Sequence, residues 1–293
     1  GTDVEQRKLS QWMFKITEFS DALVDGLDKL DWPETTKSAQ KNWIGRSEGS
    51  LIRFKIKDFD KDIEVFTTRA DTLFGATYVV LAPENKMVQD LRSYIANWDE
   101  VEKYATETKR KSELERMTNV KSKTGIELKG VRAINPINSE EISVWIADYV
   151  LAHYGTGAVM AVPAHDQRDY DFAKKQNLEI REVIYGGDIS KKALKEDGEL
   201  INSRKFDGLA SEEARKKIVE ELQTKGLGKF VKQYRLHDWI LSRQRYWGVP
   251  IPMIKCVECG YVPVPEKDLP IKLPKLDDFK PTGDGKSPLA KSE

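Results

Sequence analysis

The spacing of the hydrophobic residues changes near residue 45, and this change most constrains how the chain folds. Before it, apolar residues recur at steps of three and four, which places them on one face of a long helix. They are Leu9, Trp12, Ile16, Phe19, Leu23, Leu27 and Leu30. Pro33 ends this helix, because the residue before a proline avoids helical dihedral angles. A shorter helix is predicted over 34–44, followed by a turn over 45–49.

After this turn, apolar and polar residues alternate, which is the pattern of half-buried strands. The predicted strands are 51–56, 63–66, 76–81, 142–147 and 158–162. Helices are predicted over 97–123 and 166–176. A further helix starts with Ser211 as its N-cap, ends at Gly226 and buries one apolar face. That face carries Ala214, Ile218 and Leu222. The pattern predicts a mixed α/β fold.

The composition excludes several classes of protein. At roughly 150 residues per domain, the 293 residues predict two structural units. The 48 basic and 48 acidic residues leave no net charge, which argues against a histone-like binder of polyanions. No apolar run approaches the roughly 18 residues of a membrane span, and the N-terminus lacks a signal-peptide pattern. We expect a cytoplasmic protein that does not bind a membrane.

Two cysteines form half of a zinc knuckle. Cys256 and Cys259 have the spacing of one ligand pair, but a structural zinc site needs four ligands and the chain has no second pair. Neither His165 nor His237 lies at knuckle spacing, so we expect no bound metal. The chain also lacks the phosphate-binding glycine motifs and the Gly-x-Ser-x-Gly nucleophile motif.

The first candidate site follows the predicted strand 63–66. Here Thr67-Thr68-Arg69-Ala70-Asp71-Thr72 places three hydroxyls, one guanidinium and one carboxylate at the end of a strand. Such groups can hold ribose hydroxyls or a phosphate. Alternatively, the threonine and aspartate side chains satisfy their own backbone in a polar turn, and the spacing alone favours this interpretation.

The second candidate site follows the predicted strand 158–162. A Gly155-Thr-Gly157 turn precedes this strand, which leads to His165, Asp166 and Asp169 at the start of a helix. The two carboxylates are three residues apart and share a helix face, where they could bind an ammonium group or orient a water. Alternatively, Asp166 is an N-cap and Asp169 interacts with the helix dipole. The spacing does not choose between them.

Together these motifs resemble the leucyl-tRNA synthetase family. Thr67-Thr-Arg-Ala-Asp-Thr72 and Gly155-Thr-Gly-Ala-Val-Met-Ala-Val-Pro-Ala-His-Asp-Gln-Arg-Asp-Tyr170 are similar to its connective-polypeptide editing domain of bacterial or organellar type. Asn42–Gly49 resembles the start of that domain, and Asp238–Gly248 resembles the return to the catalytic core. The family's His-Ile-Gly-His and Lys-Met-Ser-Lys-Ser signatures are absent.

The resemblance implies a fold and a division of the chain. We expect a β-barrel-like editing domain with surrounding helices over 46–230. A helical segment of the catalytic core would occupy 1–45, and 231–293 would return to that core with the half zinc knuckle. ATP and Mg²⁺ belong to the missing synthetic site, so the fragment is not expected to aminoacylate, and editing needs no cofactor.

The resemblance also implies a reaction. A hydrophobic pocket separates amino acids that differ by one methylene by only about 1–3 kcal/mol, so a second site must hydrolyse the wrong product. The substrate would be leucine tRNA mischarged with isoleucine or a similar amino acid. The expected partners are the acceptor end of that tRNA, the non-cognate amino acid ester and the remaining synthetase domains.

Residue roles follow from the same resemblance. Asp169 would bind the substrate's α-ammonium, Thr72 would narrow the pocket against leucine, and Asp166 or the substrate's ribose hydroxyl would assist proton transfer to or from an attacking water. The residues expected to contact the substrate are Thr67, Thr68, Arg69, Asp71, Tyr154, Met160, Val162 and His165. A rival hypothesis is a tRNA-binding fragment with an idle editing site, built on Arg243, Arg245, Tyr246 and Trp247.

Overall fold

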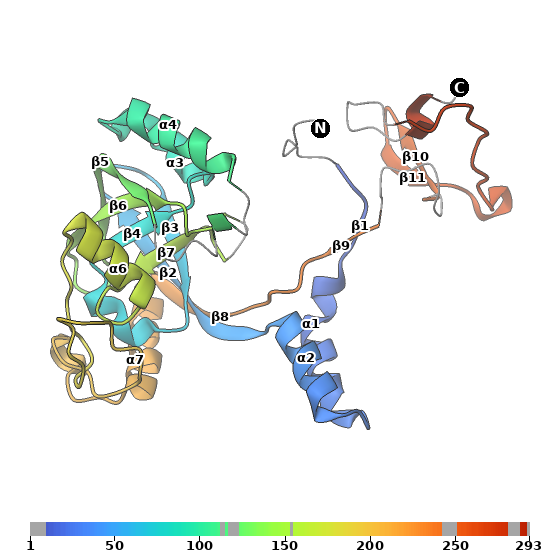
Figure 1. The fold of residues 1–293 in the computed structure, drawn as a ribbon. Coiled ribbons are helices and arrows are strands. Elements are labelled where there is room, and N and C mark those ends of the chain that lie inside the picture. Colours follow the sequence, from blue (N-terminus) through green and yellow to red (C-terminus); the bar gives the residue numbers. More distant parts are fainter. Residues whose placement is uncertain are drawn as a thin grey trace. The chain divides into compact units, whose positions relative to one another are not determined.

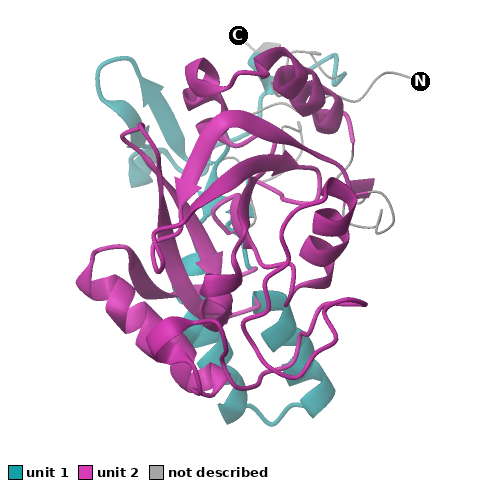
Figure 2. Ribbon diagram, turned by 90° about the vertical axis from the view of Figure 1, so that its left-hand side faces the viewer, with its two compact units in different colours: residues 1–44, 236–293 teal, residues 45–235 magenta. Residues whose placement is uncertain are grey.

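The structure is a computed structural model that describes residues 10–111, 115–116, 123–152, 155–241, 251–280 and 288–291. The chain divides into two compact units, which Figure 2 colours separately. The larger unit is formed by residues 45–235, and the smaller unit by 1–44 together with 236–293. Both candidate motifs lie in the larger unit.

A mixed sheet of seven strands forms the centre of the larger unit. In spatial order its strands are β3 (Asp62–Thr67), β2 (Ser47–Ile56), β5 (Gly125–Ile134), β6 (Glu141–Ala147), β4 (Tyr78–Leu81) and β7 (Ala158–Ala161), and β8 (Gly228–Gln233) also pairs with β2. All neighbours are antiparallel except β4 and β6. The predicted hairpin of β2 and β3 is confirmed.

The β2–β8 pair brings the two ends of the larger unit together. Ser47 pairs with Gln233, and the register continues to Ile52 opposite Gly228. Two residue pairs further out, the amide of Arg235 donates to the carbonyl of Gly45 over 3.3 Å. The first and last residues of this unit are therefore neighbours in space.

The sheet curls without closing. The mixed α/β class is confirmed, and the edge strands β3 and β7 lie close together. However, among the described strands no hydrogen-bonded ladder joins β3 to β7, so the predicted barrel is open there. Just after β7, the Val162 amide donates to the Asp169 carboxylate, and Pro163 has no amide hydrogen.

In the described part of the chain, four helices with defined ends and several short 3-10 turns surround this sheet. They are α3 (Lys86–Asp90), α4 (Trp98–Lys109), α6 (Gln167–Gln176) and α7 (Ser211–Thr224). In Figure 1, α3 and α4 lie at the opposite end of the sheet from α7. Asp166 is the N-cap of α6, which is one of the two alternatives that the spacing left open. Ser211 is not the N-cap of α7, since Ala210 holds that position and the Ser211 hydroxyl donates to the Gly198 carbonyl.

The core lies on both faces of the central strands. In β4, Val79 and Leu81 pack into the main hydrophobic cluster, whereas Tyr78 and Val80 face a second cluster beneath α6. Phe172 of α6 belongs to this second cluster. Strands buried on both faces read as continuous apolar runs. From α7, the predicted residues Ala214, Ile218 and Leu222 all enter the main cluster.

In the smaller unit, the long N-terminal helix that the periodicity predicts is confirmed only over residues 16–29, and there as a short α-helix between two 3-10 turns. Before this stretch, β1 (Met13–Phe14) pairs with β9 (Trp239–Ile240), and the Thr17 amide and hydroxyl both donate to Asp238. These contacts take the backbone away from helix formation. The remaining elements are η1 (Ile16–Phe19), α1 (Ser20–Gly26), η2 (Leu27–Lys29), the predicted α2 (Glu34–Ile44), β10 (Met253–Cys256), β11 (Gly260–Pro263), η6 (Glu266–Asp268) and η7 (Pro288–Lys291). None of the described helices combines the length and apolar character needed to cross a bilayer.

The buried face of α7 supplies a test of the fold. Leu222 is fully buried in the main cluster, so Leu222→Ala should lower the free energy of unfolding by about 2–5 kcal/mol through lost apolar burial and the cavity it leaves. Urea denaturation of the full chain measures this change. The matched control is Glu220→Ala on the exposed face, which should change it by less than about 0.5 kcal/mol. Equal effects of the two substitutions would contradict the packing of α7.

Candidate functional site

The two sequence motifs meet at one end of the sheet. Thr67 ends β3 and leads into the 3-10 turn η3 (Ala70–Gly75), while β7 leads through Val162 to α6. The end of η3 lies against this second segment, because a Cβ added to Gly75 would stand only 3.3 Å from a methyl of Val162. The fold therefore places the threonine-rich motif beside the segment that carries the aspartates.

Backbone contacts of Arg69 hold two of the three threonines. Its amide donates to the Thr67 hydroxyl over 3.0 Å, and its carbonyl accepts from the Thr72 hydroxyl over 2.8 Å. Thr72 is buried and Thr67 is half-buried, while Thr68 between them is exposed. The alternative that these side chains satisfy their own backbone is therefore correct for Thr67 and Thr72. Thr68 keeps its hydroxyl at the surface.

The Arg69 side chain is anchored inside the protein. Its guanidinium donates to both carboxylate oxygens of Asp71 over 3.0–3.2 Å and to the Lys195 carbonyl over 2.8 Å. Asp71 is completely buried and also accepts from Arg215 of α7 over 3.0 Å. Arg69 and Asp71 therefore brace the loop, and Lys195 and Arg215 are partners that the sequence analysis did not find.

Asp169 is a buried carboxylate without a cationic partner among the described residues. One of its oxygens accepts from the Val162 amide over 2.9 Å, and the other from the Tyr149 hydroxyl over 3.4 Å. Burial, together with the negative charge of Asp166, raises the pKa of Asp169 from 3.8 to about 7, although these two hydrogen bonds and Arg168 act to lower it. Burial also raises the pKa of Tyr149, so its hydroxyl is protonated and can donate. A carboxylate held in this way favours binding of a cation.

Asp166 caps the helix that carries Asp169. Its carboxylate accepts from the amides of Arg168 and Asp169 over 2.8 and 3.2 Å and pairs with the Arg168 guanidinium at 3.4 Å. Asp166 is half-exposed and keeps contact with solvent. It thus performs the capping role that the sequence left open, and its negative charge stands close to Asp169.

His165 connects two loops through both ring nitrogens. Its Nδ1 lies 3.0 Å from the Leu194 carbonyl, and its Nε2 accepts from the Val183 amide over 3.1 Å. An Nε2 acceptor assigns the neutral ring with its hydrogen on Nδ1. Burial lowers the pKa of His165, which also favours the neutral form. Both nitrogens are therefore used by the backbone.

The remaining predicted site residues are apolar or lie outside the described part of the chain. Met160 and Val162 belong to the main hydrophobic cluster and are 7% and 5% exposed, so only small portions of them could line a pocket. Tyr154 lies outside the described residues, as do Arg243, Arg245, Tyr246 and Trp247.

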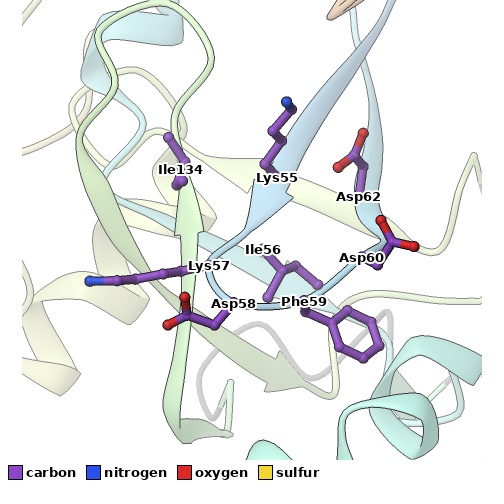
Figure 3. Close-up of a pocket in the computed structure, with 8 residues that line it drawn as sticks. All are labelled: Lys55, Ile56, Lys57, Asp58, Phe59, Asp60, Asp62 and Ile134. Carbon is purple, nitrogen blue, oxygen red and sulfur yellow. The ribbon is translucent and has the colours of Figure 1, made fainter.

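A hollow of about 540 Å³ lies away from these motifs. It surrounds the β2–β3 turn and is lined by Lys55, Ile56, Lys57, Asp58, Phe59, Asp60, Asp62 and Ile134 (Figure 3). Asp62 begins β3 and Thr67 ends it, so the hollow is at the opposite end of that strand from the threonine motif. None of the predicted site residues lines it.

The described residues contain no group of three or more His, Cys, Asp or Glu side chains arranged to hold a metal ion. Cys256 and Cys259 stand at the β10–β11 hairpin, where the Cys259 amide donates to the Cys256 sulfur over 3.4 Å. This contact lowers the pKa of the Cys256 thiol. The pair remains two ligands of the four that a structural zinc site requires.

Comparison with known proteins decides the family. The family described as leucyl-tRNA synthetase, editing domain, matches residues 41–223, which include both motifs and most of the larger unit. The chain belongs to the leucyl-tRNA synthetase editing-domain family. This membership agrees with the resemblance of the two motifs.

Similar proteins extend the likeness beyond the editing domain. The leucine–tRNA ligase of Clostridium beijerinckii is 57% identical over 297 residues, which cover all of this chain and 36% of that protein. The enzyme of Clostridium perfringens is 54% identical with the same coverage. A crystal structure of a ternary LeuRS–tRNA–LeuAMS complex from Agrobacterium radiobacter has a TM-score of 0.75 and 39% identity, covering 90% of this chain and 30% of that one. The chain therefore spans about a third of the length of these leucyl-tRNA synthetases.

The raised pKa of Asp169 predicts how stability depends on pH. Between about pH 4 and pH 7 the folded protein keeps a proton on Asp169 that the unfolded chain releases, so stability falls as pH rises, by up to about 1.4 kcal/mol per pH unit. Asp169→Asn should remove this contribution of Asp169 to the pH dependence of stability. Urea denaturation of the full chain at pH 5, 6 and 7 measures the difference between the variant and the wild type.

The control is Asp171→Asn, which changes an exposed carboxylate of the same helix and should leave the slope as in the wild type. Parallel curves for the wild type and Asp169→Asn would mean that Asp169 ionises at its ordinary pKa.

Proposed function

We propose that this chain carries out post-transfer editing, by hydrolysing the ester bond of mischarged leucine tRNA. The single observation that carries the proposal is Asp169, a buried carboxylate with two hydrogen-bond donors and no ion-pair partner among the described residues. An aminoacyl ester presents an α-ammonium group, which is the counter-ion that such a carboxylate lacks. Family membership supports the same reaction.

Binding of the ammonium group would oppose the effect of burial on the pKa of Asp169. A positive charge in direct contact favours the ionised carboxylate, so the pKa of Asp169 falls when the substrate binds. The Val162 amide and the Tyr149 hydroxyl then hold the carboxylate in a fixed orientation. This geometry would place the ester carbonyl, which is one bond from the α-carbon, near the end of β7.

The threonine loop would bind the other side of the ester. Thr68 is exposed, so its hydroxyl is available to the terminal ribose. The Thr67 hydroxyl accepts from the Arg69 amide and can still donate its own hydrogen to the ribose. Thr72, with its hydroxyl directed to the Arg69 carbonyl, would narrow the side-chain pocket, and Met160 and Val162 would form its apolar wall. Arg69 and Asp71 support this loop through the contacts already described.

Water is the proposed nucleophile. Its oxygen attacks the ester carbonyl carbon, the bond to the ribose oxygen breaks, and that oxygen takes a proton to regenerate the tRNA hydroxyl and the free amino acid. Asp166, which is half-exposed, or the neighbouring ribose hydroxyl would assist the proton transfer. The rate would come mainly from orientation and electrostatic stabilisation, and no cofactor is required.

The whole protein would be a cytoplasmic leucine–tRNA ligase that binds leucine tRNA and uses ATP and Mg²⁺ in a synthetic site outside this segment. The ligase names of the relatives and the tRNA present in the Agrobacterium complex support this proposal. The rival is a tRNA-binding fragment whose editing site is idle.

A single-turnover deacylation assay tests the reaction. The full chain should hydrolyse isoleucine-charged leucine tRNA and spare the leucine-charged form. Asp169→Asn should lower the rate for the isoleucine ester at least about 30-fold, because removing one member of a buried charge pair costs about 2–5 kcal/mol.

The matched control is Asp171→Asn, an exposed carboxylate on the same helix, which should leave the rate unchanged. Binding of the tRNA without hydrolysis by the wild type would support the rival, and an aminoacylated adenosine would then test whether the site works on a small ester. Failure to hydrolyse that ester as well would refute the proposed function.

The role of Thr72 generates a separate prediction. Thr72→Ala should enlarge the side-chain pocket, so hydrolysis of leucine-charged tRNA should rise by about 10- to 200-fold, the discrimination that one methyl group provides. The rate of release of radiolabelled leucine measures this. Thr72→Ser keeps the hydroxyl and removes only the methyl group, so a similar increase in both variants assigns the effect to the methyl. An intact leucine ester in both would show that Thr72 does not narrow the pocket.

A further inference from the structure

Four charged side chains form a closed ring of alternating sign beside the threonine loop. We call Arg69, Asp71, Arg215 and Asp197 the charge ring. Asp71 accepts from Arg69 and Arg215 over 3.0–3.2 Å. Arg215 donates to Asp197, and Asp197 completes the ring with the Arg69 guanidinium at 3.6 Å. Each charge therefore has an opposite charge on both sides.

The members of the charge ring differ in burial. Asp71 is completely buried, the two arginine side chains are about one quarter exposed, and the Asp197 side chain is 54% exposed. A buried carboxylate depends on its cations, because losing one leaves charge without compensation in a region of low dielectric. Asp71 thus holds the two arginines together at the buried side, and Asp197 bridges them at the surface.

The charge ring acts on the threonine hydroxyls through Arg69. The side chain of Arg69 is fixed by the ring and by the Lys195 carbonyl, and its backbone holds the hydroxyls of Thr67 and Thr72. Neither threonine contacts Arg215 or Asp197 in this network. The hydrogen bonds and ion pairs that link these two charged residues to the threonines therefore run through Asp71 and Arg69.

The charge ring also connects the two motifs. Asp197 lies three residues after Leu194, whose amide donates to the Ala164 carbonyl over 2.8 Å and whose carbonyl is bound by the His165 ring. Segment 194–197 therefore contacts the threonine motif through Lys195 and Asp197, and the aspartate motif through Leu194. A shift of this segment would move the two sides of the proposed site relative to each other.

Helix α7 gives the charge ring a rigid support. Arg215 follows the buried Ala214, and Ala214 and Ile218 pack with Ala70 and Leu73 of η3 in the main cluster. The helix and the loop are thus fixed by apolar packing, while Arg215 supplies the polar contact. A supporting residue on a packed helix holds a loop more accurately than a residue on another loop.

We propose that Arg215 and Asp197 are positioning residues for the editing reaction, which act through Asp71 and Arg69 to fix the hydroxyls of Thr67 and Thr72. This inference rests on the proposed function. Loss of either residue loosens the threonine loop, so the ribose is held less accurately and the pocket accepts leucine more readily. Binding of the ammonium at Asp169 stays intact, because Asp169 is not part of the charge ring.

The test compares Arg215→Gln and Asp197→Asn with two controls on exposed positions of α7, Lys216→Gln and Glu212→Gln. Two measurements are made on the full chain. Single-turnover deacylation of isoleucine- and leucine-charged leucine tRNA gives the rate constant and the half-saturating concentration for each ester. Hydrogen exchange followed by mass spectrometry reports the protection of the peptide that contains residues 67–75, and does not depend on activity.

Both ring variants should lower the rate constant for the isoleucine ester at least about tenfold, since small misplacements of positioning groups cost up to about 10²-fold. The half-saturating concentration should stay within about threefold of the wild type. The ratio of leucine to isoleucine hydrolysis should rise, which a smaller folded fraction cannot produce because it lowers both rates equally. Arg215→Lys keeps one positive charge and should restore part of the rate.

Exchange in residues 67–75 should be faster in both ring variants and unchanged in both controls. The double variant Arg215→Gln with Asp197→Asn should resemble either single variant, because residues of one network are not additive. If Arg215→Gln does not fold, Asp197→Asn still tests the inference, because the Asp197 side chain is largely exposed and its replacement leaves the core intact.

Unchanged exchange in residues 67–75 would overturn the inference whatever the activity. Hydrolysis by the wild type with unchanged rates and discrimination in both ring variants would also overturn it while the proposed function stands. Faster exchange in the variants, with no hydrolysis by the wild type of either tRNA or an aminoacylated adenosine, would refute the proposed function alone and leave the charge ring as the support of the loop.

Discussion

The hydrogen bond from the Val162 amide to the Asp169 carboxylate determines much of this structure. It uses the backbone amide that directly follows β7, at the open edge of the curled sheet beside β3. It also fixes the carboxylate at the first turn of α6, where Asp166 caps the helix. One contact therefore joins the end of a strand to the first turn of a helix and orients a buried carboxylate.

Local patterns were enough to predict most of the strands and helices of the larger unit. The β2–β3 hairpin, β6, β7 and α6 follow from alternation and capping within short windows. Strand β5 was missed because its alternation is interrupted at Gly130, where the ladder with β6 shifts register, and β8 was missed because it has only two apolar residues. Both strands are stabilised by pairing with other segments. The predicted long helix at the N-terminus starts only at Ile16, since β1 before it pairs with a strand more than 200 residues away.

The two motifs of the candidate site were visible in the sequence because each is a continuous stretch. The residues that support these motifs from other parts of the chain were not visible in the sequence. Arg215, Asp197 and Lys195 contact the threonine loop from more than 120 residues away, and an arginine on an amphipathic helix looks like any solvent-exposed charge. For His165 the sequence identified the residue but not its contacts, and the structure shows that backbone groups bind both of its ring nitrogens. Spacing identifies residue types, but only the fold shows which atoms are still free.

The pairing of β2 with β8 makes this unit suited to insertion into another protein. Gly45 and Arg235 are joined by a hydrogen bond, so the chain leaves the larger unit almost where it enters. A domain with adjacent ends can be inserted into a loop of a host protein without separating the residues on either side of the insertion point. The host keeps its own core, and the inserted unit can gain, lose or exchange its activity without changing the topology of the protein around it.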